Sequence, residues 1–260
     1  MTYDDILYEV RNGAAWITIN RPEKHNAFRG QTCEELIRAL NTAAWDKSIG
    51  VIVLAGAGDR AFCTGGDQSA HEGQYDGRGT IGLPMEELHT IIRDAPKPVI
   101  ARVQGYAIGG GNVLCTICDF TIASDKASFG QVGPKMGSVD PGFGTAYLAR
   151  VVGEKKAREM WYMCRRYSAQ EALHMGLINA VVPHLELDAE VQRWCDEIMD
   201  KSPTAIAIAK RSFNMDSEAI RGNAAFGMQA LQLYYETDES KEGVRAFGEK
   251  RKPDFRKFVS

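Results

Sequence analysis

A serine and an aspartate lie two residues apart in a loop rich in glycine and proline. The loop reads FGQVGPKMGSVDPGFG over residues 129–144, and its two polar residues are Ser138 and Asp140. A hydroxyl and a carboxylate held together could orient or deprotonate a water molecule. The competing structural explanation is a turn hydroxyl and a helix N-cap, since residues 142–150 form a helix that Asp140 would cap.

Glycine clusters mark two predicted strand-to-helix junctions, CTGGDQ at residues 63–68 and YAIGGGN at residues 106–112. Neither matches the phosphate loop of nucleotide-binding proteins or the dinucleotide-binding fingerprint. Glycines can simply allow close packing, but they also let backbone N–H groups at a helix N-terminus face a negative oxygen. Two such N–H groups from separate loops would form an oxyanion hole, which suits a reaction through an enolate or a tetrahedral oxyanion.

The two glycine clusters and the loop 129–144 can form one site only if the strands before them lie side by side. ILYEV and AAWITIN flank Asn12-Gly13, which predicts a hairpin with a type I′ turn. GVIVLAGAG and PVIARVQGYA are continuous apolar runs typical of buried parallel strands, and FTIASDKASFGQ returns to strand. Helical spacing of apolar residues is found between these strands. The alternation of strand and helix predicts an α/β fold with right-handed crossovers.

The pattern becomes mainly helical after Gly142. Because nearly all of the chain beyond Ser202-Pro203 is helical in pattern, we expect an α/β core over residues 1–200 and a helical region over residues 201–260.

The composition excludes several classes of function. A net charge of −3 gives no electrostatic reason to expect nucleic acid or an anionic membrane as a partner. No apolar run approaches the roughly 20 residues of a membrane span. The N-terminus MTYDDILYEV lacks the basic start and apolar middle of a signal peptide. We therefore expect a cytoplasmic protein.

The cysteines and histidines do not predict a metal site. Cys115 and Cys118 form a lone C-x-x-C in an apolar run, and no second pair of ligands accompanies them. We expect these two thiols to be buried and structural. His71, His89, His174 and His184 show no spacing typical of metal ligands, so no metal is expected.

Four segments together resemble the crotonase (enoyl-CoA hydratase/isomerase) superfamily: INRPEKHNAF, DRAFCTGGDQ, KPVIARVQGYAIGGGN and the loop at 129–144. The resemblance spans roughly residues 5–258. It implies a crotonase-type spiral of ββα turns with a helical C-terminal region, an acyl-CoA thioester substrate, no separate cofactor, and a homohexamer made of two trimers. It also implies that the N–H groups of Gly66 and Gly110 form the oxyanion hole for the thioester carbonyl.

The chain departs from the hydratase pattern at two positions. Hydratases of this family carry one catalytic glutamate three residues after the oxyanion glycine, where this chain has Val113, and another two residues after FGQ, where it has Gly133. Hydration of an enoyl-CoA by that route is therefore not expected. The isomerase and hydrolase branches more often place an acid further along the second loop, where Asp140 lies.

Further motifs resemble a narrower subgroup, namely GGDQ, FGQ-x-GPK-x-GS-x-D, YLAR-x-VG-x-KKARE, YETDES and KRKPDFRKF. The subgroup includes the ring-forming 1,4-dihydroxy-2-naphthoyl-CoA synthases, whose functional Ser, Asp and Tyr fall on Ser138, Asp140 and Tyr235. These synthases carry a Lys-Val-Arg run after GGDQ, whereas residues 69–72 here read Ser-Ala-His-Glu. The chain as a whole is more similar to the ring-opening 2-ketocyclohexanecarboxyl-CoA hydrolases, which have the same three residues.

This resemblance implies retro-Dieckmann ring opening of a cyclic β-ketoacyl-CoA, in the anaerobic degradation of aromatic and alicyclic acids. Asp140 would orient or deprotonate the water, Ser138 would hold the water or the ketone oxygen, and Tyr235 would protonate the enolate. Asp140 and Tyr235 could exchange roles without any change in the sequence. Ring formation by a synthase is the alternative reaction. A non-catalytic binding protein, such as an RNA-binding relative, is the other alternative, against which the pI near 6.0 argues.

The resemblance also implies contacts with CoA. His25 would lie near the phosphates, the backbone of residues 64–68 would surround the adenine, and Lys250 would approach the 3′-phosphate. Bicarbonate or water could bind beside Gly133, where some of the synthases hold bicarbonate. The residues expected to contact substrate or CoA are His25, Thr64, Gly65, Gly66, Asp67, Gln68, Tyr106, Ile108, Gly109, Gly110, Gln131, Gly133 and Lys250.

Overall fold

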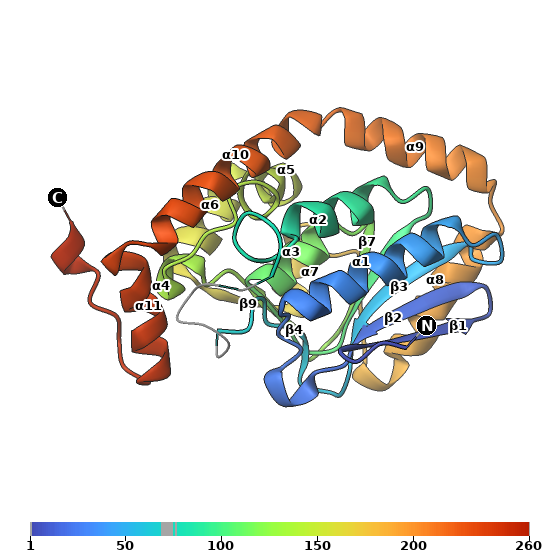
Figure 1. Ribbon diagram of the computed structural model, residues 1–260. Coiled ribbons are helices and arrows are strands. Elements are labelled where there is room, and N and C mark those ends of the chain that lie inside the picture. Colours follow the sequence, from blue (N-terminus) through green and yellow to red (C-terminus); the bar gives the residue numbers. More distant parts are fainter. Residues whose placement is uncertain (1, 69–74, 76, 260) are drawn as a thin grey trace.

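The computed structural model describes residues 2–68, 75 and 77–259, and Figure 1 shows its sheets and helices. A larger sheet has the strand order β1-β2-β3-β5-β7-β10, and a smaller sheet has the order β4-β6-β8-β9. The larger sheet contains β1 (Ile6–Arg11), β2 (Ala14–Ile19), β3 (Val51–Gly56), β5 (Val99–Val103), β7 (Phe120–Ser124) and β10 (Ala180–Val182). The smaller sheet contains β4 (Ala61–Cys63), β6 (Tyr106–Ile108), β8 (Ser128–Gly130) and β9 (Arg166–Ser168).

A ββα unit repeats along the chain and builds both sheets at once. β3, β4 and helix α2 (Met85–Asp94) form one turn, β5, β6 and α3 (Gly110–Ile117) the next, and β7, β8 and α4 (Gly133–Met136) the third. Each turn adds one strand to each sheet, and the strands of successive turns pair in parallel. This arrangement confirms the predicted spiral of ββα turns.

The larger sheet is buried on both faces. Helix α1 (Gly30–Trp45) directs buried side chains such as Leu36 and Leu40 into the core that it shares with β2 and β3. Helix α8 (Leu187–Met199) contributes a second apolar cluster, in which Leu187 packs with Trp16 of β2. Burial on both faces explains why strands such as β3 are continuously apolar in sequence.

The hairpin prediction is confirmed. β1 and β2 pair antiparallel, with Arg11 opposite Ala14. Asn12 and Gly13 have φ values of 46° and 79°, the left-handed conformation that a type I′ turn requires at both central positions.

The chain after Gly142 is mainly helical, as predicted, but β9 and β10 interrupt it. Strands of three residues are too short to show a periodic pattern, so the sequence did not reveal them. The helical segments here are η2 (Phe143–Tyr147), α5 (Leu148–Val152), α6 (Glu154–Met163), α7 (Ala169–His174), η3 (His184–Glu186), α8, α9 (Pro203–Met215), α10 (Glu218–Tyr235), α11 (Asp238–Gly248) and η4 (Arg256–Phe258). Figure 1 shows α9 running apart from the sheets, with α10 and α11 leading to the C-terminus on the opposite side from the N-terminus.

A partly buried ion pair attaches α9 to the spiral core. The Lys210 ammonium group is 2.7 Å from the Asp119 carboxylate and also donates to the carbonyl groups of Ile92 and Lys97, each at 2.9 Å. Because α10 follows directly, this attachment also fixes where α10 returns across the core.

The thiols of Cys115 and Cys118 are both buried and unpaired, which confirms their predicted placement. Within the described residues, no helix combines the length and apolar character needed to cross a bilayer. Across the same residues, no three His, Cys, Asp or Glu side chains are grouped as metal ligands would be.

Candidate active site

The smaller sheet brings the two glycine clusters into contact. Strands β4 and β6 run parallel, with Cys63 opposite Ala107, so the loops that follow them leave the same edge of the sheet. A Cβ atom added to Gly65 would lie only 2.9 Å from the Gly110 nitrogen. Gly65 and Gly109 also have φ values of 87° and 57°, which favour glycine. Glycine is therefore required here by both packing and conformation.

The backbone N–H groups of Gly66 and Gly110 have no hydrogen-bond partner in the part of the chain that the structure describes. Phe28 donates to the Gly65 carbonyl at 2.8 Å and accepts from the Asp67 N–H at 2.9 Å, so the intervening Gly66 N–H points away from Phe28. Gly110 is the first residue of α3, where N–H groups lack partners within the helix. Two free donors from adjacent loops form the arrangement that an oxyanion hole needs.

A tyrosine that the sequence did not reveal lies against Gly66. A Cβ atom added to Gly66 would meet the Tyr75 hydroxyl oxygen at 1.9 Å. The Gln68 amide group donates to that hydroxyl at 3.2 Å and to the Gly66 carbonyl at 3.3 Å. Burial raises the pKa of Tyr75, so its hydroxyl stays protonated and can donate a hydrogen bond. Tyr75 lies in a polar, aperiodic stretch, which gave no signal for a buried ring.

Residues 69–74 and 76, in the same stretch, are outside the described residues. They include Ser69-Ala70-His71-Glu72, the segment whose lack of cations separates this chain from the ring-forming synthases.

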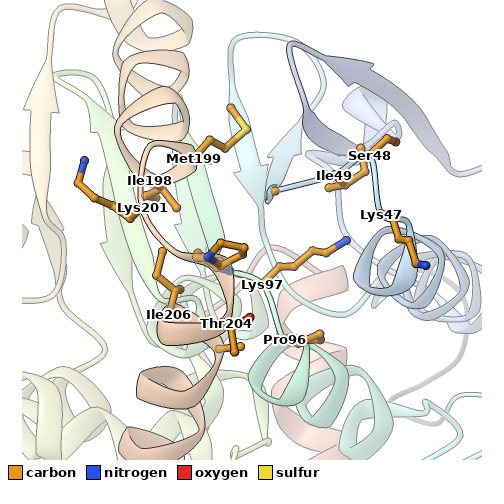
Figure 2. Close-up of a pocket in the computed structure, with 14 residues that line it drawn as sticks. Lys47, Ser48, Ile49, Pro96, Lys97, Ile198, Met199, Lys201, Thr204 and Ile206 are labelled. Atoms are coloured by element: carbon orange, nitrogen blue, oxygen red, sulfur yellow. The ribbon is translucent and has the colours of Figure 1, made fainter.

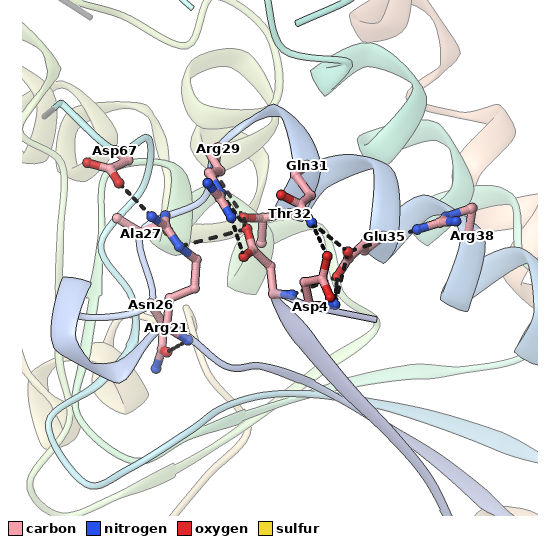
Figure 3. A network of polar contacts seen from close by, with 11 residues as sticks. Asp4, Arg21, Asn26, Ala27, Arg29, Gln31, Thr32, Glu35, Arg38 and Asp67 are labelled. Carbon is pink, nitrogen blue, oxygen red and sulfur yellow. Dashed lines mark hydrogen bonds and ion pairs between the residues drawn. The ribbon is translucent and has the colours of Figure 1, made fainter. Parts of the chain in front are cut away.

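Buried charges fix the oxyanion loop to the segment after β2 (Figure 3). Arg21 donates to the Asp67 carboxylate at 2.8 Å and also to the Ala27 carbonyl. Both charged side chains are about nine-tenths buried. Asn26 donates to the carbonyl groups of Ala57 and Ala61, which extends the network to the first residue of β4. The carboxylate of Asp67, a predicted CoA contact, is therefore turned toward Arg21, and its backbone continues the oxyanion loop.

Replacing Arg21 by methionine is expected to lower the free energy of unfolding by about 3 kcal/mol, since it leaves the Asp67 carboxylate buried without its cation. Chemical denaturation monitored by circular dichroism would measure this change. Arg158→Met, which removes the exposed pair between Arg158 and Glu154 on α6, is the control and should change it by less than about 1 kcal/mol. Equal effects of the two changes would contradict the assigned importance of the buried network.

The second loop brings Ser138 to Tyr235, which lies far away in the sequence. Their hydroxyl oxygens are 2.8 Å apart, and Tyr235 reaches the loop from the end of α10. Burial is the largest influence on Tyr235 and raises its pKa; the hydrogen bond shared with Ser138 lowers the pKa, and the nearby Asp140 raises it. Tyr235 is therefore a neutral phenol near neutral pH and can act as a proton donor.

Asp140 lies beside this pair and also stabilises the loop. Its Oδ1 atom accepts hydrogen bonds from the N–H groups of Gly142 at 3.2 Å and Gly144 at 2.7 Å. Asp140 thus accepts from N–H groups at the start of η2, as the loop composition suggested, although the N-cap residue itself is Gly142. Its other oxygen, Oδ2, has no hydrogen bond within the described ranges, so one carboxylate oxygen remains for a ligand or water.

Two observations connect the second loop to the glycine junction. A Cβ atom added to Gly144 would lie 2.7 Å from the Asp140 Cβ and 2.9 Å from a Val113 methyl group, so Asp140 and Val113 are neighbours. Val113 follows Gly110 by three residues on α3, on the same face of the helix. Tyr235 is close enough to Tyr75, which lies beside Gly66, to raise the pKa of Tyr75 after burial has done so. The free N–H groups and the Ser138, Asp140 and Tyr235 side chains therefore border one site.

The position of the second hydratase glutamate has no room for a side chain. A Cβ atom added to Gly133 would lie 2.5 Å from the Ser138 carbonyl oxygen and 2.6 Å from the Trp161 ring. The Trp161 ring is held in place by a hydrogen bond from its Nε1 to the Gly144 carbonyl. The absence of a carboxylate at this position is thus imposed by packing.

Gln131 supplies an unused donor near Gly133. Its side chain is 1% exposed, and its Nε2 atom has no hydrogen-bond partner in the described structure. A buried amide without a partner is costly and needs an acceptor. Water or bicarbonate, the two ligands expected beside Gly133, would each provide one.

Replacing Gly133 by glutamate tests this packing directly. We expect the variant to lose about 1–3 kcal/mol of stability through overpacking and to gain no measurable hydration of crotonyl-CoA. Val113→Glu, at the other hydratase position, is the matched comparison and tests whether one carboxylate suffices. A Gly133→Glu variant that folds normally and hydrates crotonyl-CoA would show that the Trp161 ring yields to the new side chain.

Only some of the remaining residues predicted to contact CoA lie near the oxyanion loop. The Thr64 hydroxyl donates to the His25 carbonyl at 3.3 Å, which joins His25 to the oxyanion loop. The Tyr106 ring is 37% exposed, with the Arg166 guanidinium 5.2 Å from its centre. Ile108 is buried and lies opposite Gly130 in the smaller sheet. Lys250 is exposed just after α11, and no hydrogen bond or ion pair between described residues connects it to residues 64–68.

A cavity of about 530 Å³ lies elsewhere, at the amino ends of β3 and β5 (Figure 2). Its lining includes the lysines Lys47, Lys97 and Lys201 and apolar side chains such as Ile198 and Met199. Lys97 already donates to the carbonyl groups of Ala43 and Asp46 at the end of α1. None of the predicted site residues lines this cavity, so it is separate from the catalytic arrangement.

Comparison with known proteins identifies the family. The enoyl-CoA hydratase/isomerase family model matches residues 9–257. An enoyl-CoA hydratase from Mycobacterium avium subsp. paratuberculosis K-10 is 29% identical, with a TM-score of 0.87 over 98% of this chain and 99% of the other. Carnitinyl-CoA hydratase from Mycobacterium avium is also 29% identical, with a TM-score of 0.85 over 98% of this chain and 100% of the other. A methylmalonyl-CoA decarboxylase is 27% identical, with a TM-score of 0.85 over 98% and 99%. The chain therefore belongs to the enoyl-CoA hydratase/isomerase family.

Proposed function

We propose that the protein hydrolytically opens the ring of a cyclic β-ketoacyl-CoA, converting 2-ketocyclohexanecarboxyl-CoA to pimeloyl-CoA. The observation that carries the proposal is the Ser138–Tyr235 pair beside Asp140, at a glycine junction with two free N–H groups. Because Val113 and Gly133 occupy the two positions of the hydratase glutamates, the chain lacks both carboxylates that hydration would use. Membership of the family, whose structural relatives include enzymes named for CoA thioesters, supports a CoA thioester as substrate.

The first step of the proposed reaction is addition of water to the ring ketone. Asp140 accepts one proton from the water through its free oxygen, while its other oxygen keeps the loop in place. The Ser138 hydroxyl orients the water or the ketone oxygen. The product of this step is a tetrahedral oxyanion at the former ketone carbon.

The second step breaks the bond between the former ketone carbon and the Cα of the thioester. The former ketone carbon becomes the new carboxyl group, and the electron pair passes into the thioester as an enolate. The Gly66 and Gly110 N–H groups stabilise the enolate oxygen, and each such donor is worth about 3 kcal/mol of barrier in comparable sites. Tyr235 protonates Cα, and the proton that Asp140 took from water replaces the one that Tyr235 lost.

Ring formation by a naphthoate-type synthase is the alternative, because it would use the same Ser138, Asp140 and Tyr235. A direct assay separates the two reactions. The purified protein is incubated with 2-ketocyclohexanecarboxyl-CoA and, separately, with the open-chain CoA ester that the synthases cyclise, and the products are identified by mass spectrometry. Pimeloyl-CoA from the first ester supports the proposal, whereas turnover of the second ester alone supports the synthase. Turnover of neither ester favours a binding protein.

We further propose that the region 201–260 completes the active site and forms the contacts of a homohexamer made of two trimers. Tyr235 of α10 is its contribution to the site. Large apolar side chains are exposed on its helices: Ile208, Phe213, Phe226, Leu233 and Phe247. Such a surface favours association. Light scattering would measure a mass near six times 28.7 kDa for the hexamer.

We propose that this reaction serves the anaerobic breakdown of aromatic and alicyclic acids in the cytoplasm. Six unpaired cysteines are compatible with a reducing compartment.

A further inference from the structure

Helix α2 directs a buried histidine toward the loop that holds Asp140. The His89 side chain is 1% exposed, and its Nε2 atom has no hydrogen-bond partner among the described residues. Its ring meets the Phe143 ring edge-on, at a centroid distance of 5.4 Å and an interplanar angle of 86°. A buried imidazole nitrogen without a hydrogen-bond partner costs folding free energy. The presence of a histidine at this position therefore needs an explanation other than packing.

The position of Phe143 connects His89 to Asp140. Phe143 lies between Gly142 and Gly144, whose N–H groups both donate to Asp140 Oδ1. The imidazole therefore packs against the short turn that orients the carboxylate. Asp140 is also close enough to His89 to influence its protonation directly.

Arg93 lies one turn after His89 on the same face of α2. Its guanidinium group is 5.1 Å from the centre of the Phe143 ring and 4.5 Å from that of Tyr147, and its Nη2 donates to Ser217 at 2.6 Å. Its Nη1 atom is buried without a partner in the described structure. Helix α2 thus packs the His89 imidazole and the Arg93 guanidinium against the turn 143–147.

Several groups raise or lower the pKa of His89. Burial is the largest influence and lowers its pKa; Asp140 and then Glu86 raise it, and Arg93 lowers it. The result is a pKa below the ordinary value of 6.5. Among the other titratable groups of packed elements, Lys210 of α9 is already paired with Asp119. His89 is therefore neutral at neutral pH and becomes a buried cation in acid.

We propose that His89 is a positioning residue that leaves Asp140 active as a base while the imidazole is neutral and silences Asp140 when the imidazole takes up a proton. The reason is electrostatic: a cation buried against the turn that orients Asp140 opposes the transfer of a proton to that carboxylate. This inference rests on the proposed role of Asp140.

The pH dependence of kcat/KM for ring opening tests the coupling. In His89→Gln, we expect the acid limb to move to lower pH by about one unit, because the variant has no buried imidazole to take up a proton. His89→Asn serves as a second variant if the glutamine does not fold. His174→Gln, which removes an exposed histidine at the end of α7, is the matched control and should leave the profile unchanged. An acid limb that stays in place in both His89 variants, or a uniform loss at every pH, would overturn the proposal.

A second measurement is independent of the reaction. The protein is labelled at the histidine rings, and the pKa of His89 is measured by nuclear magnetic resonance with and without Asp140→Asn. Since the Asp140 charge raises the pKa of His89, we expect that pKa to fall in the variant. Identical titrations, or a wild-type ring that stays neutral to pH 4.5, would overturn the coupling. A fall in the pKa without any ring-opening activity would instead reject the proposed function and retain the coupling.

Discussion

Asp140→Asn is expected to lower kcat for ring opening by about a thousandfold, within the range that general-base catalysis contributes, and to leave binding of the CoA ester nearly unchanged. The asparagine oxygen can still accept from the Gly142 and Gly144 N–H groups, so the loop should keep its shape. What is lost is the second oxygen as a proton acceptor. Steady-state kinetics with the ketocyclohexane ester and calorimetric titration with a non-cleavable analogue measure the two effects.

Asp46→Asn is the matched control for this prediction. Asp46 also lies in a loop and accepts a hydrogen bond from the N–H group two residues later, that of Ser48, at 2.8 Å. Its carboxylate is remote from the glycine junction, so its replacement should leave kcat within about twofold of wild type. If Asp140→Asn retains most of the wild-type kcat, Asp140 is only a cap and the assigned base is wrong.

Tyr235→Phe is expected to lower kcat by about a hundredfold or more, since the enolate would lose its proton donor. KM should change little, because the ring itself still fills its place at the end of α10. Since the pKa of Tyr235 is raised above its ordinary value of 10, the wild-type enzyme should keep this donor protonated up to about pH 10. Single-turnover experiments in deuterated water would show slow appearance of the label at Cα in the variant.

Tyr234→Phe provides the control for the neighbouring position. Burial and then Glu239 raise the pKa of Tyr234 to about 12, and the hydroxyl that bonds to Ser138 is that of Tyr235. We expect this variant to have near wild-type kinetics. Equal losses in the two phenylalanine variants would assign the effect to packing of α10 and would remove Tyr235 from the mechanism.

The sequence predicted much of the fold because the relevant signals are local. Continuous apolar runs marked β3 and β5, Asn12-Gly13 marked the hairpin, and glycine clusters marked the two junctions. The strands β9 and β10 escaped detection because three residues carry no periodicity. Their pairing depends on contacts between distant segments of the chain.

The site could be predicted only in part, for the same physical reason. Ser138 and Asp140 stood out because a glycine- and proline-rich loop is unusual, but the approach of Tyr235 depends on how α10 crosses the core. Tyr75 and His89 gave no signal, since an aromatic or a histidine in a polar or helical stretch is ordinary. Their importance comes from burial against Gly66 and Phe143, which is a property of the folded chain.

Turnover of 2-ketocyclohexanecarboxyl-CoA in water enriched in heavy oxygen tests whether the protein opens the ring hydrolytically. We expect pimeloyl-CoA that carries solvent oxygen in its new carboxylate, with the thioester intact. Release of free CoA with label in a ring-retaining keto acid would identify a thioesterase and contradict the account. Unlabelled, unreacted ester after prolonged incubation would contradict it as well.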